Sequence, residues 1–145
     1  MVLNPSENQI TQLIYVSKRK SIVDDDEAQK ILETSRKNND TCGIKGVLLV
    51  LPEYFFQVVE GPSKNIDELM NRVENDTRHC ELKVLSKKAL SGYEFGVWSM
   101  VNVNIDTENA DSFVVLNRLA KTESPTEGQL KGMYFIFKGL SQPPC

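Results

Sequence analysis

Two apolar runs separated by a proline constrain the fold of this chain more than any other stretch. The runs GVLLVL and YFFQVVEG flank Pro52 and Glu53 within residues 46–61. Both are rich in β-branched and aromatic residues, and a proline at the turn occupies a position that needs no ladder donor, so we expect a β-hairpin. Gln57 is the exception in this buried strand. Burying its amide without a partner costs roughly 1–3 kcal/mol, so another protein group or a ligand should hydrogen-bond to it.

Periodic segments around the hairpin predict a strand and two helices. Residues 12–17, QLIYVS, are typical of a short strand. Apolar residues at helical spacing predict a first helix from Asp24 to Asn38. Ser63 is expected to cap a second helix. Its apolar residues recur at i, i+3, i+4 and i+7, namely Ile66, Leu69, Met70 and Val73.

Two more strands complete the predicted core, over residues 81–90 and 97–103. The order is then β-α-β-β-α-β-β, which predicts an α+β fold. It is the split βαβ pattern of a ferredoxin-like sheet plus one strand. In this topology the first and third strands of the chain are adjacent. Two helices cover one face of the sheet and leave the other face open.

Residues 106–145 are expected to cover that open face with two helices. The first candidate is the amphipathic segment 110–121. The second begins at Ser124, which is followed by a proline and by Glu127, a pattern that predicts a capping box. Its apolar face comprises Leu130, Met133, Tyr134 and Phe137. A surface that binds a second chain is the alternative, and the two uses are compatible.

Composition sets the broad class of the protein. With 145 residues, 40% of them hydrophobic, we expect one domain, divided into a core (1–104) and a helical appendage (105–145). The net charge of -3 and the lack of a basic, aromatic cluster argue against nucleic-acid binding. No run of ~18 apolar residues and no signal peptide occur, so we expect a cytoplasmic protein that does not contact a membrane.

Cysteine and histidine usage argues against a disulfide framework and a metal site. The three cysteines, Cys42, Cys80 and Cys145, are odd in number and widely spaced. His79 is the only histidine. Zinc sites take their ligands mostly from these two residue types, so we expect free thiols and no metal.

Polar residues in the predicted core indicate a ligand pocket. Tyr15 lies mid-strand, and it would neighbour Gln57 if both side chains point to the helix side. Asn38 and Asn39 end the first helix, and Asn39 would present an amide at the same edge. Each residue also has a simpler explanation, such as a packed tyrosine, a helix C-cap or a solvent-facing glutamine. Their convergence in an apolar pocket is how a planar heterocycle is recognised.

A family resemblance supports this interpretation. The motifs LIYVS, SRKNNDTCGIKGVLL, FFQVVEG, NRVENDTRH and VWSM occur in this order over residues 12–103. They resemble the successive motifs of the BLUF family, small blue-light receptor domains that use FAD. The family fold is the one predicted above from periodicity. The resemblance implies a bound FAD, with FMN and riboflavin as alternatives, between the two helices and the sheet.

The resemblance also implies roles for individual residues. Tyr15 and Gln57 would be the photochemical pair, with Gln57 reaching N5 and O4 of the flavin. Trp98 and Met100 match a motif whose side chains shift near the glutamine on signalling, although both also suit core packing. The other implied flavin contacts are Asn38, Asn39, Arg72, Asp76, Arg78 and His79. Of these, Arg72 and Asp76 lie four apart on the second predicted helix, and the last four suit a solvated helix end with an i,i+4 ion pair equally well.

The implied mechanism is light-driven electron and proton transfer from Tyr15 through Gln57, which leaves the amide rotated or tautomerised. The new hydrogen bond to O4 would shift absorption to the red. Residues 105–145 leave no room for an effector domain, so the protein would not be an enzyme. It would signal through a downstream protein partner and through homo-oligomer contacts.

Two other functional classes compete with this one. An acylphosphatase-type hydrolase lacks the necessary Gly-rich basic loop here, and fold alone does not fix function. A regulatory module with the same fold but no photochemistry is the second alternative. The joint presence of Tyr15, Asn39, Gln57 and Met100 argues against it.

Overall fold

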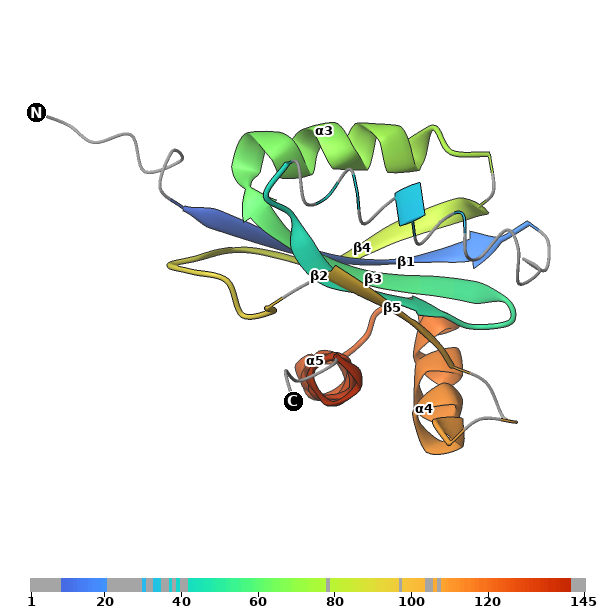
Figure 1. The fold of residues 1–145 in the computed structure, drawn as a ribbon. Coiled ribbons are helices and arrows are strands. Elements are labelled where there is room, and N and C mark those ends of the chain that lie inside the picture. Colours follow the sequence, from blue (N-terminus) through green and yellow to red (C-terminus); the bar gives the residue numbers. More distant parts are fainter. Residues whose placement is uncertain are drawn as a thin grey trace, which may run out of the picture.

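A five-stranded mixed sheet forms the centre of the computed structural model (Figure 1). Its strands are β1 (Ile10–Arg19), β2 (Lys45–Val50), β3 (Tyr54–Pro62), β4 (His79–Leu90) and β5 (Trp98–Asn102). The helices described are α3 (Ser63–Glu74), α4 (Ala110–Ala120) and α5 (Glu127–Leu140). The structure describes residues 9–20, 30, 33–34, 37, 39, 42–77, 79–96, 98–103, 106 and 108–141. Within these residues no helix has the length and apolarity to cross a membrane.

The strand order β4-β1-β3-β2-β5 confirms the predicted α+β fold. β1 and β3 are adjacent, as the ferredoxin-like topology requires, and all pairs are antiparallel except β2 with β5. Pro52 lies in the turn between β2 and β3, so the predicted hairpin is also confirmed. The predicted first helix, residues 24–38, falls almost entirely outside the described residues.

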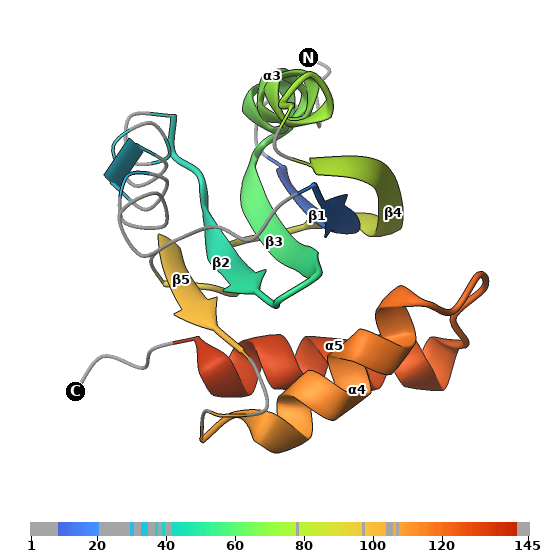
Figure 2. The same cartoon turned by 90° about the vertical axis from the view of Figure 1, so that its right-hand side faces the viewer.

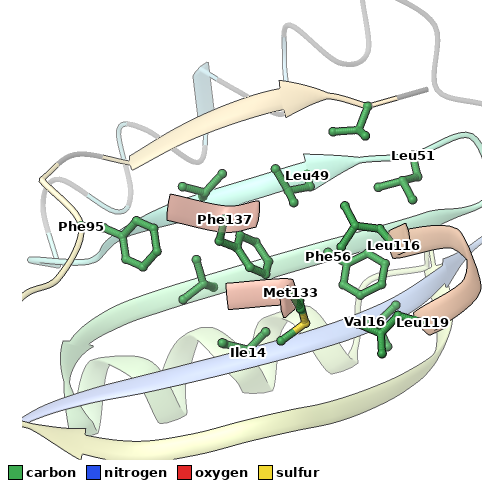
Figure 3. Packing of buried hydrophobic residues seen from close by; sticks show 13 residues of the cluster. Ile14, Val16, Leu49, Leu51, Phe56, Phe95, Leu116, Leu119, Met133 and Phe137 are labelled. Atoms are coloured by element: carbon green, nitrogen blue, oxygen red, sulfur yellow. The ribbon is translucent and has the colours of Figure 1, made fainter. Parts of the chain in front are cut away.

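Successive residues of the central strands point into two different layers, because side chains alternate along a strand. On one face, Leu13, Tyr15 and Val59 pack with Ile66 and Met70 of α3. On the opposite face lie α4 and α5 (Figure 2). The second layer, shown in Figure 3, joins strand residues such as Ile14, Leu49 and Phe56 to Leu116, Leu119, Met133 and Phe137 of the two C-terminal helices. The appendage therefore covers the open sheet face, as predicted.

Two helix starts differ from those predicted. α3 has Pro62 at its N-cap position without a side-chain cap, and Ser63 is already its first helical residue. α5 begins later than predicted, at Glu127, with Thr126 as the N-cap. Ser124 and Glu127 do not form the box. Instead the Gln129 amide donates to Thr126 Oγ1 at 3.1 Å, and the Thr126 amide donates to Gln129 Oε1 at 2.8 Å.

Gly46 allows β2 to approach β3 closely. A Cβ at this position would lie 1.9 Å from the Val58 carbonyl oxygen, and its φ of +148° is one that other residues rarely adopt. Gly46 is also the register partner of Trp98 in β5. The sheet beneath Trp98 therefore depends on a residue without a side chain.

Candidate functional site

Tyr15 and Gln57 form a buried pair on the face of the sheet that carries α3. They are direct register partners, and the Tyr15 hydroxyl donates to Gln57 Oε1 at 2.5 Å. Their exposed fractions are 4% and 6%. The predicted adjacency is confirmed. Because Oε1 accepts the hydroxyl, the two hydrogens on Gln57 Nε2 point away from Tyr15, and the hydrogen bond from Tyr15 is the only one that described residues make to this side chain.

The same rung of the sheet continues to β5. Leu48 is the register partner of Gln57 on one side and of Met100 on the other. Paired residues on neighbouring strands face the same side, so Met100 lies level with Gln57, one strand beyond Leu48. Met100 is half-buried and packs against a cluster that contains Leu48 and Trp98. Both residues of the predicted motif thus face the Gln57 side of the sheet.

Trp98 brings an unsatisfied polar atom to this face. Its side chain is 3% exposed and packs with Leu48, Val50 and Phe55. Its indole Nε1 is buried and has no hydrogen-bond partner among the described residues. A buried indole N–H usually finds an acceptor, so this atom is suited to a bound group.

His79, at the start of β4, also lies beside the pair. Its ring centroid is 6.5 Å from that of Tyr15 and 6.2 Å from that of Phe55. Nε2 is 2.7 Å from the Val73 carbonyl oxygen, and since a carbonyl only accepts, Nε2 carries the hydrogen. The other ring nitrogen, Nδ1, is buried and has no partner in the described ranges.

The structure places the remaining predicted contacts differently from one another. Asn39 is buried, and its carbonyl accepts from the amide of Ile44, which packs with Tyr15. Arg72 is exposed in the last turn of α3. Asp76 is not on the helix as predicted, because α3 ends at Glu74 and the Asp76 amide bonds to the carbonyl of Val73. The other two predicted contacts, Asn38 and Arg78, lie outside the described residues.

The chemistry of this face suits a planar ligand with polar edges. Gln57 offers donors, His79 offers its second ring nitrogen, and the surrounding surface is apolar. Cys42 and Cys80 are free thiols. In the described part of the chain, no three His, Cys, Asp or Glu residues gather as metal ligands would.

A comparison with known protein families identifies the family of this chain. The model of the family described as sensors of blue-light using FAD (BLUF) matches residues 10–101. The chain belongs to the BLUF family. Membership supports a photoreceptor role, and the family is defined by a flavin cofactor.

Similar proteins extend the BLUF comparison. The photoactivated adenylate cyclase subunit alpha of Euglena gracilis is 32% identical over 88 residues, which are 59% of this chain and 9% of the relative. BlrB, a BLUF protein solved in its dark state, has a TM-score of 0.73 and 22% identity, and the match covers 92% of this chain and 99% of that one. BlsA in its photo-activated state gives 0.71 and 23%, covering 94% and 99%. The chain spans about a tenth of the length of the cyclases it matches, with 9% to 12% for the subunits alpha and beta.

The residues of this BLUF chain fit a flavin. Three buried or nearly buried polar groups lack a partner within the described residues: the Gln57 Nε2 hydrogens, Trp98 Nε1 and His79 Nδ1. They surround apolar side chains on the face that carries α3. A flavin ring has an apolar plane and a polar edge, so both features of the site have a counterpart in the cofactor.

Sequence reasoning missed a second buried polar site, on the other face of β3. Glu60 is three residues from Gln57, points to the α5 side, and is fully buried. Its carboxylate accepts from Gln12 Nε2 at 2.7 Å and from the backbone amides of Glu94 and Phe95 at 2.8 and 2.9 Å. A charged residue inside the apolar run FFQVVEG was the available signal, since buried charges need partners.

Glu60 thereby connects β3 to α5. The Tyr134 hydroxyl donates to the Glu94 carboxylate, and Lys138 Nζ donates to the Glu94 carbonyl. The rings of Phe95 and Tyr134 meet edge to face at 6.0 Å. We call the set Gln12, Glu60, Glu94, Phe95 and Tyr134 the Glu60 network. It joins β1, β3, the segment before β5, and α5.

Proposed function

We propose that this BLUF protein is a blue-light photoreceptor that binds FAD non-covalently and signals by rearranging the hydrogen bond between Tyr15 and Gln57. The observation that carries the proposal is the 2.5 Å bond from the Tyr15 hydroxyl to Gln57 Oε1 in an apolar setting. It leaves the Nε2 donors of Gln57 for the ligand. FMN and riboflavin offer the same ring and are the alternatives.

The flavin contacts proposed from the family resemblance include polar groups other than the Tyr15–Gln57 pair. Gln57 would donate to the N5 and O4 edge, and Asn39 would bond to the imide edge because an amide offers donors and acceptors. His79 would meet the other carbonyl region together with Arg78. Met100 would pack beside Gln57. The further proposed contacts, with the ribityl and phosphate region, are Asn38, Arg72 and Asp76.

The protein's part of the mechanism is to supply and return one electron and one proton. A flavin held in this site would supply blue-light absorption and, once excited, a strong oxidant. Tyr15 would give one electron to that oxidant, and its hydroxyl proton would pass along the hydrogen bond to Gln57. When both return, Tyr15 is restored and the Gln57 amide is rotated or tautomerised.

Rotation of Gln57 reverses the polarity of its contacts. In the rotated amide, Nε2 faces Tyr15 and Oε1 faces the ligand. The Tyr15 hydroxyl must then accept where it had donated. A new hydrogen bond to O4, donated by the second Nε2 hydrogen of the rotated amide or by the O–H of its tautomer, would account for a red-shifted absorption. The altered amide also presents a different neighbour to Leu48 and Met100.

The output is proposed to leave through the C-terminal helices. We divide the chain into a photosensory core, residues 1–104, and an output appendage, residues 105–145. We propose that the appendage carries no catalytic activity of its own and acts by contacts with a downstream protein and with further copies of the chain. The cyclase activity named for the Euglena relatives is not proposed for this chain, which matches only a small share of them.

Visible spectroscopy of the purified chain tests the proposal. We expect a yellow protein, release of FAD by acid, and a reversible red shift under blue light. Tyr15→Phe and Gln57→Leu should keep the flavin and lose the shift, because one removes the phenol and the other the amide. Chromatography of the released chromophore separates FAD from FMN and riboflavin.

Matched variants exclude a general effect of substitution. Tyr54→Phe removes a hydroxyl in β3, and Gln12→Leu removes a buried amide on the opposite face of the sheet. Both should keep the red shift. A chain that cannot be loaded with any flavin, or a normal photoshift in Gln57→Leu, would refute the proposal.

A further inference from the structure

A cleft of about 570 Å³ lies between α5 and the β1–β4 side of the sheet, on the face opposite the Tyr15–Gln57 pair. Its apolar lining comprises Ile14, Leu130 and Met133, of which Ile14 and Met133 appear in Figure 3. The volume falls within the roughly 300–1,000 Å³ of typical ligand sites. It accommodates one or two anchoring side chains of a partner rather than a whole helix.

The lining of this cleft is cationic although the chain as a whole is acidic. Lys88, Lys131 and Lys138 line it, whereas the net charge of the chain is -3. Among the described lining residues the one carboxylate is that of Glu127, which lies 3.5 Å from Lys131, so these two charges offset each other and Lys88 and Lys138 leave the lining net positive. Lys88 Nζ stands 5.4 Å from the Tyr134 ring centroid, which helps to hold its charge at the cleft. The charge therefore favours an anionic occupant.

An exposed aromatic side chain adjoins the lysines. Phe135 also lines the cleft and is 80% exposed, more than any other large hydrophobic residue described. Phenylalanine is enriched in the buried centres of protein interfaces, and a partner that covered this ring would remove it from water. The occupant should therefore carry apolar surface as well as negative charge.

Gln12 adds a third requirement. It lines the cleft and is 1% exposed; its Nε2 bonds to Glu60, while its Oε1 has no partner among the described residues. A buried acceptor without a donor is unfavourable by about 1–3 kcal/mol. An ionised fatty acid supplies charge and an apolar chain but no hydrogen to donate. A polypeptide supplies carboxylates, apolar side chains and backbone N–H donors together.

We propose that this cleft is a docking site for a segment of a partner protein in which an apolar anchor is flanked by acidic residues. Its role as the output site rests on the proposed photoreceptor function, but the binding itself does not. Gln12 and Tyr134 belong both to the cleft and to the Glu60 network, so an occupant would contact the groups that join α5 to β3.

Peptide binding to the full chain tests the proposal. The probe is a fluorescein-labelled 12-residue peptide with central Leu and Phe residues flanked by Glu, measured by fluorescence anisotropy in the dark. One control peptide has Gln in place of Glu, and another has Ala in place of Leu and Phe. We expect the acidic apolar peptide to bind at least about tenfold tighter than either control, and its affinity to fall with added salt.

Variants of exposed residues test whether the peptide binds in the cleft. Phe135→Ala and Lys131→Glu alter exposed side chains, so folding should be kept, and each should weaken binding by about tenfold. Lys64→Glu is the matched control: it alters an exposed lysine of α3, on the other face of the sheet, and should change binding less than about twofold. Equal binding of the acidic and Gln peptides, or unchanged affinity in both cleft variants, would overturn the proposal.

Two further measurements separate the alternatives. Displacement of the peptide by laurate at equal or lower concentration would overturn the assignment to a polypeptide in favour of an anionic amphiphile. The flavin spectrum and photoshift are recorded on the same samples. A chain that binds the peptide but takes up no flavin would refute the photoreceptor function alone, whereas a photoactive chain that ignores the peptide would refute the docking site alone.

Discussion

Gln57 and Glu60 lie in the same strand, three residues apart, yet their polar groups differ in how many hydrogen bonds they make within the described residues. Gln57 faces α3 and receives one hydrogen bond from the described residues, from Tyr15. Glu60 faces α5 and accepts three, from Gln12 and from the amides of Glu94 and Phe95. Among the described residues, the Gln57 amide keeps hydrogen-bonding capacity unused, whereas the Glu60 carboxylate uses its capacity within the protein.

This difference makes the Gln57 amide easier to reorient than the Glu60 carboxylate. Turning the Gln57 amide exchanges one hydrogen bond, worth about 1 kcal/mol net. Releasing the Glu60 carboxylate would leave a buried charge unpaired, which costs several times more, about 3–5 kcal/mol. Rotation of the Gln57 amide therefore costs little free energy, which suits the proposed signal, whereas the Glu60 carboxylate is expected to keep its hydrogen bonds.

The largest expected effect is on stability, when the hydrogen bonds to the Glu60 carboxylate are lost. Glu60→Ala should lower the free energy of unfolding by about 3–5 kcal/mol, because two buried donors and one partly buried donor lose their acceptor. Chemical denaturation monitored by circular dichroism measures it. Glu53→Ala, exposed in the hairpin turn, is the matched control and should change stability by less than about 0.5 kcal/mol. A loss below about 1 kcal/mol in Glu60→Ala would mean that water replaces the carboxylate and that the contrast with Gln57 is unfounded.

A smaller effect should appear in the coupling of the two faces. We expect blue light to change amide hydrogen exchange in residues 106–140 by about fivefold or more, in line with typical coupling energies. Two routes lead from Gln57 to the helices: across Leu48 and Met100 into β5, or along β3 to the Glu60 network. Met100→Ala interrupts the first, and Tyr134→Phe removes the hydroxyl that binds Glu94 in the second.

The pair of variants distinguishes these routes. Since β5 runs directly toward α4, we expect Met100→Ala to abolish most of the light-dependent change and Tyr134→Phe to reduce it in α5 only. Gln57→Leu is the control without a photochemical signal. If hydrogen exchange in the unsubstituted protein were identical in the dark and in the light, the appendage would not transmit the light signal.

Sequence patterns were sufficient for the parts of this fold that depend on regular periodicity. Apolar β-branched runs predicted the strands, and strand alternation with the expected topology predicted that Tyr15 meets Gln57. Helix boundaries were less determined. Thr126 with Gln129 and Ser124 with Glu127 are overlapping capping patterns two residues apart, and only the first forms. Asp76 left the predicted helix because the backbone at Asn75, with φ -93° and ψ 0°, already ends it.

Glu60 shows what periodicity does not reveal. Its partners Glu94 and Phe95 are 34 and 35 residues away, in an irregular segment between β4 and β5. No local sequence pattern in that segment predicts that the backbone amides of Glu94 and Phe95 both donate to the Glu60 carboxylate. The charged residue in an apolar run was visible in the sequence, but its partners required the tertiary structure.

The smallest predicted effect concerns Tyr93, which ties the Glu60 side to the start of β2 through a 2.6 Å bond from its hydroxyl to the Gly43 carbonyl. Burial raises the pKa of the Tyr93 phenol, and the negative charge of Glu60 raises this pKa further. The phenol is thus protonated more readily in the folded chain than in the unfolded one. Its contribution to stability is complete below the unfolded-state pKa of about 10 and is lost as the pH rises through the folded-state value.

Comparison with Tyr93→Phe isolates this contribution, since the other tyrosines titrate in both proteins. The difference in denaturation midpoint between the two should be constant from pH 7 to about 9 and should shrink above about 10. The change should be small because the Tyr93 side chain is 39% exposed and solvent screens its contacts. A constant difference up to pH 11 would show that the pKa of the Tyr93 phenol is the same in the folded and unfolded chains, so that neither burial nor the charge of Glu60 raises it.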